Sequence, residues 1–88
     1  MEVCFESSFE RDLKKIKDRQ LLKRVKETIY EVKKAENSGQ VRNLSRLIGY
    51  KSFYRIRIGD YRIGIDLVQD KIIFTRFLHR KEIYKYFP

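Results

Sequence analysis

Several residue types that define whole classes of protein are almost absent from this chain of 88 residues. It has one cysteine, Cys4, and one histidine, His79, so an internal disulfide and the usual Cys/His zinc clusters are excluded. No run approaches the ~18 apolar residues that a transmembrane helix needs, and no basic-then-apolar leader opens the chain. The single proline, Pro88, interrupts no element. We therefore expect one domain, residues 1–88, in a reducing cytoplasm, with no membrane, metal or cofactor.

What the chain has in excess is positive charge. Lys and Arg number 21 against 12 Asp and Glu, which gives a formal net charge of +9. So large an excess on so small a body attracts polyanions, nucleic acid among them. Hydrophobic residues make up 42% and aromatic residues 14% of the chain, and this supply of core residues argues against disorder.

The first part of the chain has the spacing of a strand and two helices. Residues 2–6 alternate as a short strand does. Apolar residues then recur three and four apart, directly afterwards and again over 22–32, which predicts two antiparallel helices joined near 17–19. Ser7 and Glu10 have the S-x-x-E spacing of a capping box, so we expect the first helix to be capped there.

The second part of the chain reads as strands. Residues 41–50 are irregular, but 53–58 and 61–67 alternate with period two and are rich in Ile and Tyr. The Gly59-Asp60 pair between them suits a two-residue type II′ turn. A further strand is expected over 71–78, before a short tail. The prediction is an α+β domain: an N-terminal strand, a two-helix hairpin, and a three-stranded antiparallel sheet with a C-terminal tail.

The predicted hairpin gathers arginines on one face of the sheet. With a two-residue turn, Arg57 faces Arg62 and Arg55 faces Gly64, all on the face opposite the core. Directly opposed like charges destabilise a sheet by up to ~1 kcal/mol. Guanidinium groups match phosphate oxygens bidentately, and Gly64 leaves room for a ligand near the backbone. We predict a phosphate site here.

Two simpler arrangements account for the same arginines. They could form a solvated basic face without a fixed ligand, or they could pair with the carboxylates of Asp66 or Glu82.

A second group of candidates follows the last strand. His79 could transfer protons near neutral pH, Arg80 could add to the anion site, and Tyr84 could stack on a base. The alternatives are a surface or capping histidine and a tail that simply packs on the sheet. The register is open, because no glycine marks the turn over 68–71. A two-residue loop would put Arg80 on the core side, and a three-residue loop would put it beside Arg62.

The segment F-Y-R-I-R-I-G-D-Y-R-I-G-I, followed by a strand and H-R-K-E-I-Y, resembles the RelE/ParE superfamily of prokaryotic toxins, in particular its RelE-like branch. The likeness covers nearly the whole chain. It implies a microbial RNase-like fold and a metal-independent endoribonuclease that cuts mRNA on the ribosome. It also implies neutralisation by a cognate antitoxin, expected to be acidic and RelB-like, in a toxin–antitoxin hetero-oligomer.

The resemblance assigns roles to particular residues. The catalytic residues that it implies are Arg57, Arg62, Arg80, Tyr84 and His79. RNA phosphates are expected to be bound by Arg55, Lys51 and Arg46. Relatives often carry lysines in the first-strand pair, where this chain has arginines that stay protonated, and no acid lies in 42–53. The general base is therefore unassigned.

Two other functions are compatible with the same fold. A ParE-like member would poison DNA gyrase, and a non-enzymatic member would be a basic nucleic-acid-binding module held by its antitoxin. The clustered arginines and the H-R-K-E-I-Y tail favour the nuclease over both.

Overall fold

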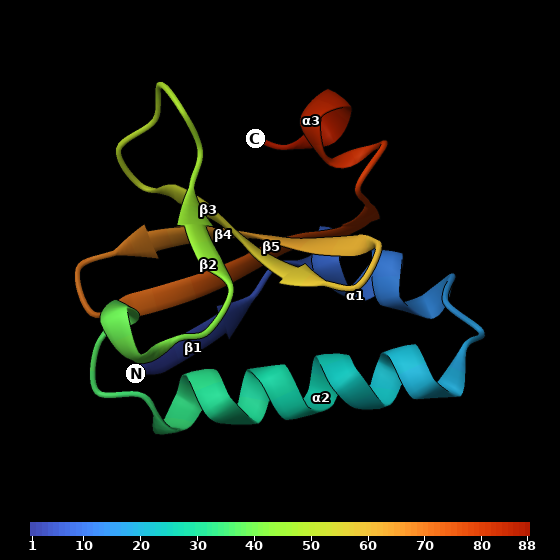
Figure 1. The fold of residues 1–88 in the computed structure, drawn as a ribbon, viewed down its shortest axis with the longest axis horizontal. Helices are drawn as coiled ribbons and strands as arrows, with labels where there is room; N and C mark the ends of the chain where they lie inside the picture. Colours follow the sequence, from blue (N-terminus) through green and yellow to red (C-terminus); the bar gives the residue numbers. More distant parts are fainter.

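A computed structural model describes all residues, 1–88, as an α+β fold with one mixed sheet (Figure 1). The elements in chain order are β1 (Glu2–Phe5), α1 (Ser7–Lys14), α2 (Arg19–Lys34), the 3-10 turn η1 (Ser38–Gln40), β2 (Leu44–Arg46), β3 (Phe53–Ile58), β4 (Tyr61–Val68), β5 (Lys71–His79) and α3 (Ile83–Tyr86). The five strands lie in the order β1-β5-β4-β3-β2. None of the helices has the length and apolar character needed to cross a bilayer.

The predicted class and element order are confirmed, with two corrections. β1 pairs parallel with β5, so the sheet is mixed. The segment expected to be irregular contributes β2, which pairs antiparallel with β3 and makes a fifth strand. Both additions lie at the edges of the antiparallel β3–β4–β5 meander that the sequence predicted.

The helix starts differ in how they are capped. Asp18 precedes α2, and its Oδ1 accepts hydrogen bonds from the amides of Gln20 and Leu21 at 3.0 and 3.2 Å. The capping box predicted at α1 is wrong, because Ser7 is already helical and the N-cap residue, Glu6, makes no side-chain cap bond. The chain leaves β1 and enters α1 with one residue between them, which leaves no place for a separate capping serine.

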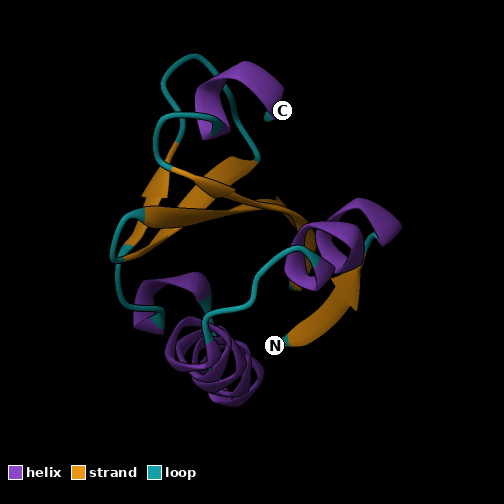
Figure 2. Cartoon of the chain, turned by 90° about the vertical axis from the view of Figure 1, so that its right-hand side faces the viewer, coloured by secondary structure: helices purple, strands orange, loops and turns teal.

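The two faces of the sheet carry separate cores. Helices α1 and α2 cover one face, and α3 lies on the other (Figure 2). The main core, between the helices and the sheet, is formed by Phe9, Val25, Val32, Ile56, Ile58, Ile63, Ile65, Ile72, Phe74 and Phe77. A smaller core under α3 is formed by Leu47, Ile83 and Phe87. The tail is therefore anchored to the face that carries the arginines.

The β3–β4 register is the predicted one. Ile58 pairs with Tyr61, Arg57 with Arg62, and Arg55 with Gly64. In the turn, Gly59 has a φ of 56° and Asp60 has no positive φ, as a type II′ turn requires. Alternation along these strands therefore places the arginines together on the face away from α1 and α2.

The last hairpin has the two-residue loop of one predicted register and the side-chain parity of the other. Its loop has two residues, since Val68 pairs with Lys71, but β5 then contains a bulge at Thr75. The extra residue restores the parity that a three-residue loop would have given. His79 pairs with Tyr61 on the helix side, and the Arg80 amide donates to the Asp60 carbonyl at 2.7 Å.

Side chains of α1 hold the bulged part of β5. β1 ends opposite Phe74, so the edge of β5 beyond it has no neighbouring strand. Ser8 Oγ donates to the Thr75 carbonyl at 2.6 Å, and Asp12 Oδ2 accepts from the Phe77 amide at 2.9 Å. Asp12 also accepts from Arg76 Nε at 2.8 Å. The helix thus satisfies backbone groups that another strand would otherwise pair.

Candidate nucleic-acid interface

Four arginines meet on the open face of the sheet. Arg55 and Arg57 come from β3, Arg62 from β4, and Arg80 from the residue after β5. Burial lowers the pKa of Arg62 from its ordinary value, and the charges of Arg57, Arg55 and Arg80 lower it further, in that order. Asp60 acts in the opposite direction as the smallest contribution. The guanidiniums of Arg57, Arg55 and Arg80 are therefore close enough to repel that of Arg62, which lies between them.

The arginines of this cluster are poorly neutralised by acids. The only ion pair in it joins Arg80 Nε to Asp60 Oδ1 at 3.9 Å, and both side chains are well exposed. Exposed pairs of this kind contribute little. Arg62 Nη1 instead donates to the carbonyls of Gly59 and Tyr61, both at 2.9 Å. These bonds fix the direction of the guanidinium without removing its charge.

The carboxylate pairing considered from the sequence does not form. Neither Asp66 nor Glu82 makes an ion pair with an arginine. Oδ1 of Asp66 is buried without any hydrogen-bond partner. The charge of the arginine cluster thus remains available to an external anion.

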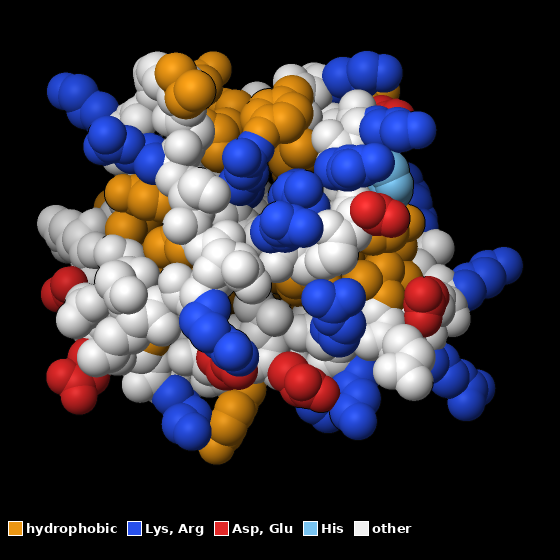
Figure 3. Space-filling view, in the orientation of Figure 1, with side chains coloured by type: hydrophobic (Ala, Val, Ile, Leu, Met, Phe, Trp, Pro, Cys, Tyr) orange, Lys and Arg blue, Asp and Glu red, His pale blue; other side chains and the backbone are white.

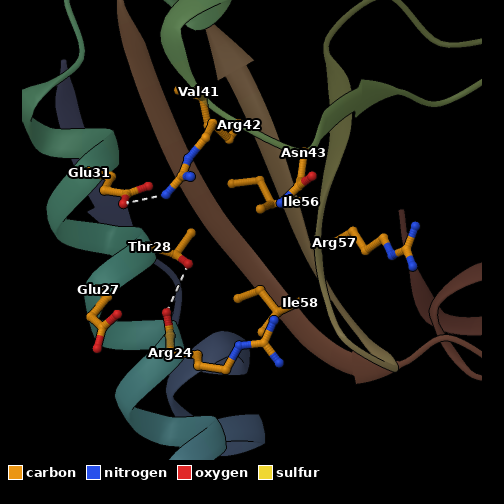
Figure 4. A pocket seen from close by; sticks show the side chains of 10 residues that line it. All are labelled: Arg24, Glu27, Thr28, Glu31, Val41, Arg42, Asn43, Ile56, Arg57 and Ile58. Atoms are coloured by element: carbon orange, nitrogen blue, oxygen red, sulfur yellow. Dashed lines mark hydrogen bonds and ion pairs between the residues drawn. The ribbon is translucent and has the colours of Figure 1, made fainter.

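Arg57 projects to the side of β3 opposite the helices. A cavity of about 270 Å³ lies between α2 and β3, and Arg57 is among the residues that line it. Figure 4 shows that the Arg57 side chain points away from α2. Glu31 and Arg42 form an ion pair at 2.9 Å within that cavity, and Thr28 Oγ1 donates to the Arg24 carbonyl. Within the cavity, acids and bases of opposite sign face each other, whereas Arg57 is directed to the open face.

Tyr84 lies beside the arginines. Its ring centroid is 5.3 Å from Cζ of Arg55, a cation–π contact, and 61% of the residue is exposed. The residues around it form a second cavity of about 290 Å³ between the loop that follows β2 and the C-terminal tail. Its lining consists of Arg46, Leu47, Ile48, Tyr50, Arg55, Tyr84, Phe87 and Pro88. Arg46 belongs to this lining, and Lys51 lies nearby in the same loop, along a shallower hollow that it shares with Arg46.

The structure does not bring His79 into the arginine cluster. Its ring packs edge-on against Tyr61, with centroids 5.3 Å apart, on the helix side of the sheet. Its Nδ1 accepts a hydrogen bond from the Lys81 amide at 3.2 Å. The bulge in β5 thus places Arg80 with the other arginines and turns His79 away from them.

The space expected beside Gly64 is already filled. A Cβ at Gly64 would lie only 2.7 Å from Cγ of Phe87, so the glycine accommodates the Phe87 ring rather than a ligand. That part of the sequence-based interpretation is wrong, because a residue close to the C-terminus covers the position. The sequence suggested for Phe87 only that the tail packs on the sheet, which it does, and did not indicate that its ring covers Gly64.

The charge on one side of the molecule is visible in Figure 3. Lys and Arg side chains run up the middle of this face and meet hydrophobic side chains at its upper edge. No three His, Cys, Asp or Glu side chains are grouped so that they could hold a metal ion. The arrangement offers fixed cations next to exposed aromatic rings, which suits single-stranded nucleic acid.

Comparison with known proteins decides the family. A sequence model described as the ParE toxin of the type II toxin-antitoxin system, parDE, matches residues 3–84. Toxin RelE3 of Methanocaldococcus jannaschii is 43% identical over 89 residues, covering 100% of both chains. The chain belongs to the RelE/ParE toxin family. It is accordingly a toxin of a type II toxin–antitoxin system.

Solved structures of this family share the fold. The RelB-RelE antitoxin-toxin complex from Methanococcus jannaschii contains a chain that is 43% identical, with a TM-score of 0.81 over 97% of this chain and 99% of that one. The toxin-antitoxin complex RelBE2 from Mycobacterium tuberculosis matches with a TM-score of 0.69 at 23% identity, over 90% of this chain and 96% of that one. The predicted RelE-type fold is confirmed.

Proposed function

We propose that this toxin is a ribosome-dependent endoribonuclease that cuts mRNA and thereby inhibits translation. The observation that carries the proposal is the cluster of Arg55, Arg57, Arg62 and Arg80, which repel one another and lack strong carboxylate partners. A sheet face chosen for folding alone would carry Thr or alternating charges there. An RNA phosphate bound among the guanidiniums would offset the repulsion.

The chemistry that fits is transesterification within the RNA chain. The ribose 2′-oxygen attacks the adjacent phosphorus and the bond from phosphorus to the 5′-oxygen breaks. Negative charge grows on the phosphate oxygens, and cations fixed in place beforehand lower that barrier. In the proposal, Arg57 and Arg62 are the cations that stabilise this charge on the phosphate oxygens. Arg55 positions the backbone, and Arg80 donates a hydrogen bond that stabilises the negative charge on the leaving 5′-oxygen, which takes its proton from the solvent.

The proton of the 2′-hydroxyl needs an acceptor that the arginines cannot provide, since they remain protonated at ordinary pH. The ring of His79 lies on the other side of the sheet against Tyr61. We therefore assign the acceptor to the ribosome, which makes cleavage dependent on it and places the protein's action in the cytoplasm.

A type II toxin needs an antitoxin, and the charge of this one indicates its nature. The net charge is +9, and the arginine face is open. We propose an acidic, RelB-like partner that binds over the face as a toxin–antitoxin hetero-oligomer. The matched relative is described as part of a RelB-RelE complex, which supports this choice.

Induced expression tests the nuclease proposal. Wild type, Arg62→Ala and Arg80→Ala are expressed side by side, and mRNA ends are mapped by primer extension. Arg11→Ala is the matched control, because Arg11 is an exposed arginine on α1 with no ion pair. New mRNA ends are expected with wild type and Arg11→Ala only. Equal toxicity of all variants without new ends would reject the proposal.

The gyrase-directed function is the second candidate, because the matching family model carries the ParE description. Double-strand DNA breaks and an SOS response on expression, with intact mRNA, would favour it. Growth unaffected by expression, together with tight antitoxin binding, would favour a non-enzymatic binding module.

A further inference from the structure

Arg24 of α2 lies against the turn that ends the arginine-bearing hairpin. Gly59, the first residue of this turn, has no side chain, and a Cβ there would lie 3.1 Å from Nη1 of Arg24. Arg62 reaches the same residue from the open face, where its Nη1 donates to the Gly59 carbonyl at 2.9 Å. Two guanidiniums, one from α2 and one from β4, therefore meet at a single turn residue from opposite faces of the sheet.

The charge of Arg24 is not neutralised within the protein. The residue is exposed and takes part in none of the ion pairs of the structure, although Glu27 lines the same cavity. Arg42, which also lines that cavity, is paired with Glu31 at 2.9 Å. Figure 4 shows the Arg24 side chain extending from α2 towards β3, whereas Arg42 is turned to its acid. Arg24 is thus a free cation beside the turn.

We propose that Arg24 binds a phosphate of the RNA that neighbours the cleaved one, so that the RNA backbone leaves the open face over the β3–β4 turn. The inference rests on the proposed function and extends its RNA-binding surface from the sheet to α2. Guanidinium groups match phosphate oxygens, and each successive phosphate of a bound strand needs its own cation. Figure 3 shows Lys and Arg side chains both over the strands and lower down, at the level of α2 in Figure 1.

Acids on α2 limit where such a strand can run. Glu27 and Glu31 follow Arg24 by about one and two helical turns on the same side of α2, and both line the cavity between α2 and β3. Their carboxylates repel phosphate groups, and Arg42 offsets only one of them. The strand therefore crosses α2 at Arg24 and does not continue along the cavity.

The test is the salt dependence of binding to a single-stranded RNA that cannot be cleaved. The probe is a short 2′-O-methyl RNA with a fluorescent end, and its anisotropy is followed between about 0.1 and 1 M salt. Each phosphate contact on a single strand contributes about 0.7 to the slope of log affinity against log salt. Arg24→Gln is expected to lower that slope by about 0.7, so its deficit against wild type should shrink about fivefold over this range. An unchanged slope would overturn the proposal.

Two variants separate the position of the charge from its amount. Arg24→Lys keeps a cation at the turn and is expected to keep the wild-type slope. Arg42→Gln removes an arginine from the same cavity, but one that Glu31 already pairs, and it is expected to leave the slope unchanged. Equal reductions in Arg24→Gln and Arg42→Gln would show that only the overall charge matters and would overturn the proposal.

A 2′-O-methyl dinucleotide with a single phosphate separates a second phosphate contact from damage to the arginine cluster. Its phosphate binds among the arginines of the open face, so wild type and Arg24→Gln are expected to bind it equally in an NMR titration. An equal loss of affinity for the dinucleotide and for the longer RNA would overturn the proposal. Arg24 would then act only by supporting the turn that holds Arg62.

Ribosomal cleavage and antitoxin binding measured in parallel distinguish the proposals. If wild type cuts mRNA but Arg24→Gln keeps the wild-type slope, the Arg24 contact is refuted and the nuclease stands. If Arg24→Gln lowers the slope as expected but wild type cuts no mRNA, the nuclease is refuted and the Arg24 contact stands. A retained slope together with a weaker antitoxin complex would assign Arg24 to the antitoxin surface and overturn the proposal.

Discussion

Replacing Arg57 by threonine should make the toxin more stable while it abolishes mRNA cleavage. Arg57 lies directly opposite Arg62, and the charge of Arg57 helps lower the Arg62 pKa. Threonine fits a strand and removes the repulsion. Like charges directly opposed cost up to ~1 kcal/mol, and in a domain of this size 1 kcal/mol corresponds to a change of about 4–8 °C in Tm. We expect Tm to rise by several degrees at low salt.

The gain in Tm should depend on salt and on pH in ways that follow from the repulsion. The Debye length falls from about 10 Å at 0.1 M salt to about 3 Å at 1 M, so the gain in Tm should shrink as salt is added. A lowered pKa means that folding disfavours the charged form of Arg62. Arginine is charged in both the folded and the unfolded state at ordinary pH. The gain in Tm of Arg57→Thr should therefore be constant between about pH 5 and 9. It should decline only as the pH approaches the folded-state pKa of Arg62.

The assay is thermal unfolding by circular dichroism at low and high salt, with Arg46→Thr as the matched control. Arg46 is an exposed arginine on β2 whose cross-strand partner is Tyr54, not a cation. Its replacement should leave Tm nearly unchanged. A destabilised Arg57→Thr, or a gain shared equally with Arg46→Thr, would show that the arginines do not repel one another and would remove the main support for the phosphate site.

Three further outcomes test the structure around the site. Asp12→Asn should lower the free energy of unfolding by about 3 kcal/mol in urea, because it leaves the partly buried Arg76 unpaired; a loss below about 1 kcal/mol would contradict this. Gly64→Ala should cost about 1–3 kcal/mol, since its Cβ would overlap the Phe87 ring, and it should disorder α3; unchanged tail signals in NMR would refute it. Thr75→Val should cost about 1 kcal/mol by removing the bond from Thr75 Oγ1 to the Gly64 carbonyl, which urea titration can measure.

The hairpin at the centre of the site was predictable because its determinants are local. The Gly59-Asp60 turn and the alternation on either side define which residues pair, and no distant contact is needed. The arginine face follows from that register alone. Arg80 and Tyr84 were candidates from their side-chain chemistry and the family likeness gave them roles, but the hairpin register alone could not place them.

The features that the sequence did not predict depend on contacts far along the chain. β2 has only three residues, and its pairing with β3, not its own pattern, makes it a strand. Gly64 appeared open because its neighbour Phe87 lies far along the sequence, near the end of the chain. Tyr50 and Tyr84 line one cavity, although 34 positions of the sequence separate them. Periodicity carries none of this information.

The bulge at Thr75 decides which residue of the His79-Arg80 pair joins the site. Without it, the two-residue loop would turn Arg80 to the helix side and bring His79, a group able to accept a proton, beside the other arginines. The bulge is held by Ser8 and Asp12 from α1, so a helix on the far face determines which charged side chains join the arginine surface. The result is a surface of permanent cations without a base. Under the proposed mechanism such a surface would stabilise a phosphate transition state but could not start the reaction, and we therefore expect this toxin to leave RNA intact away from the ribosome.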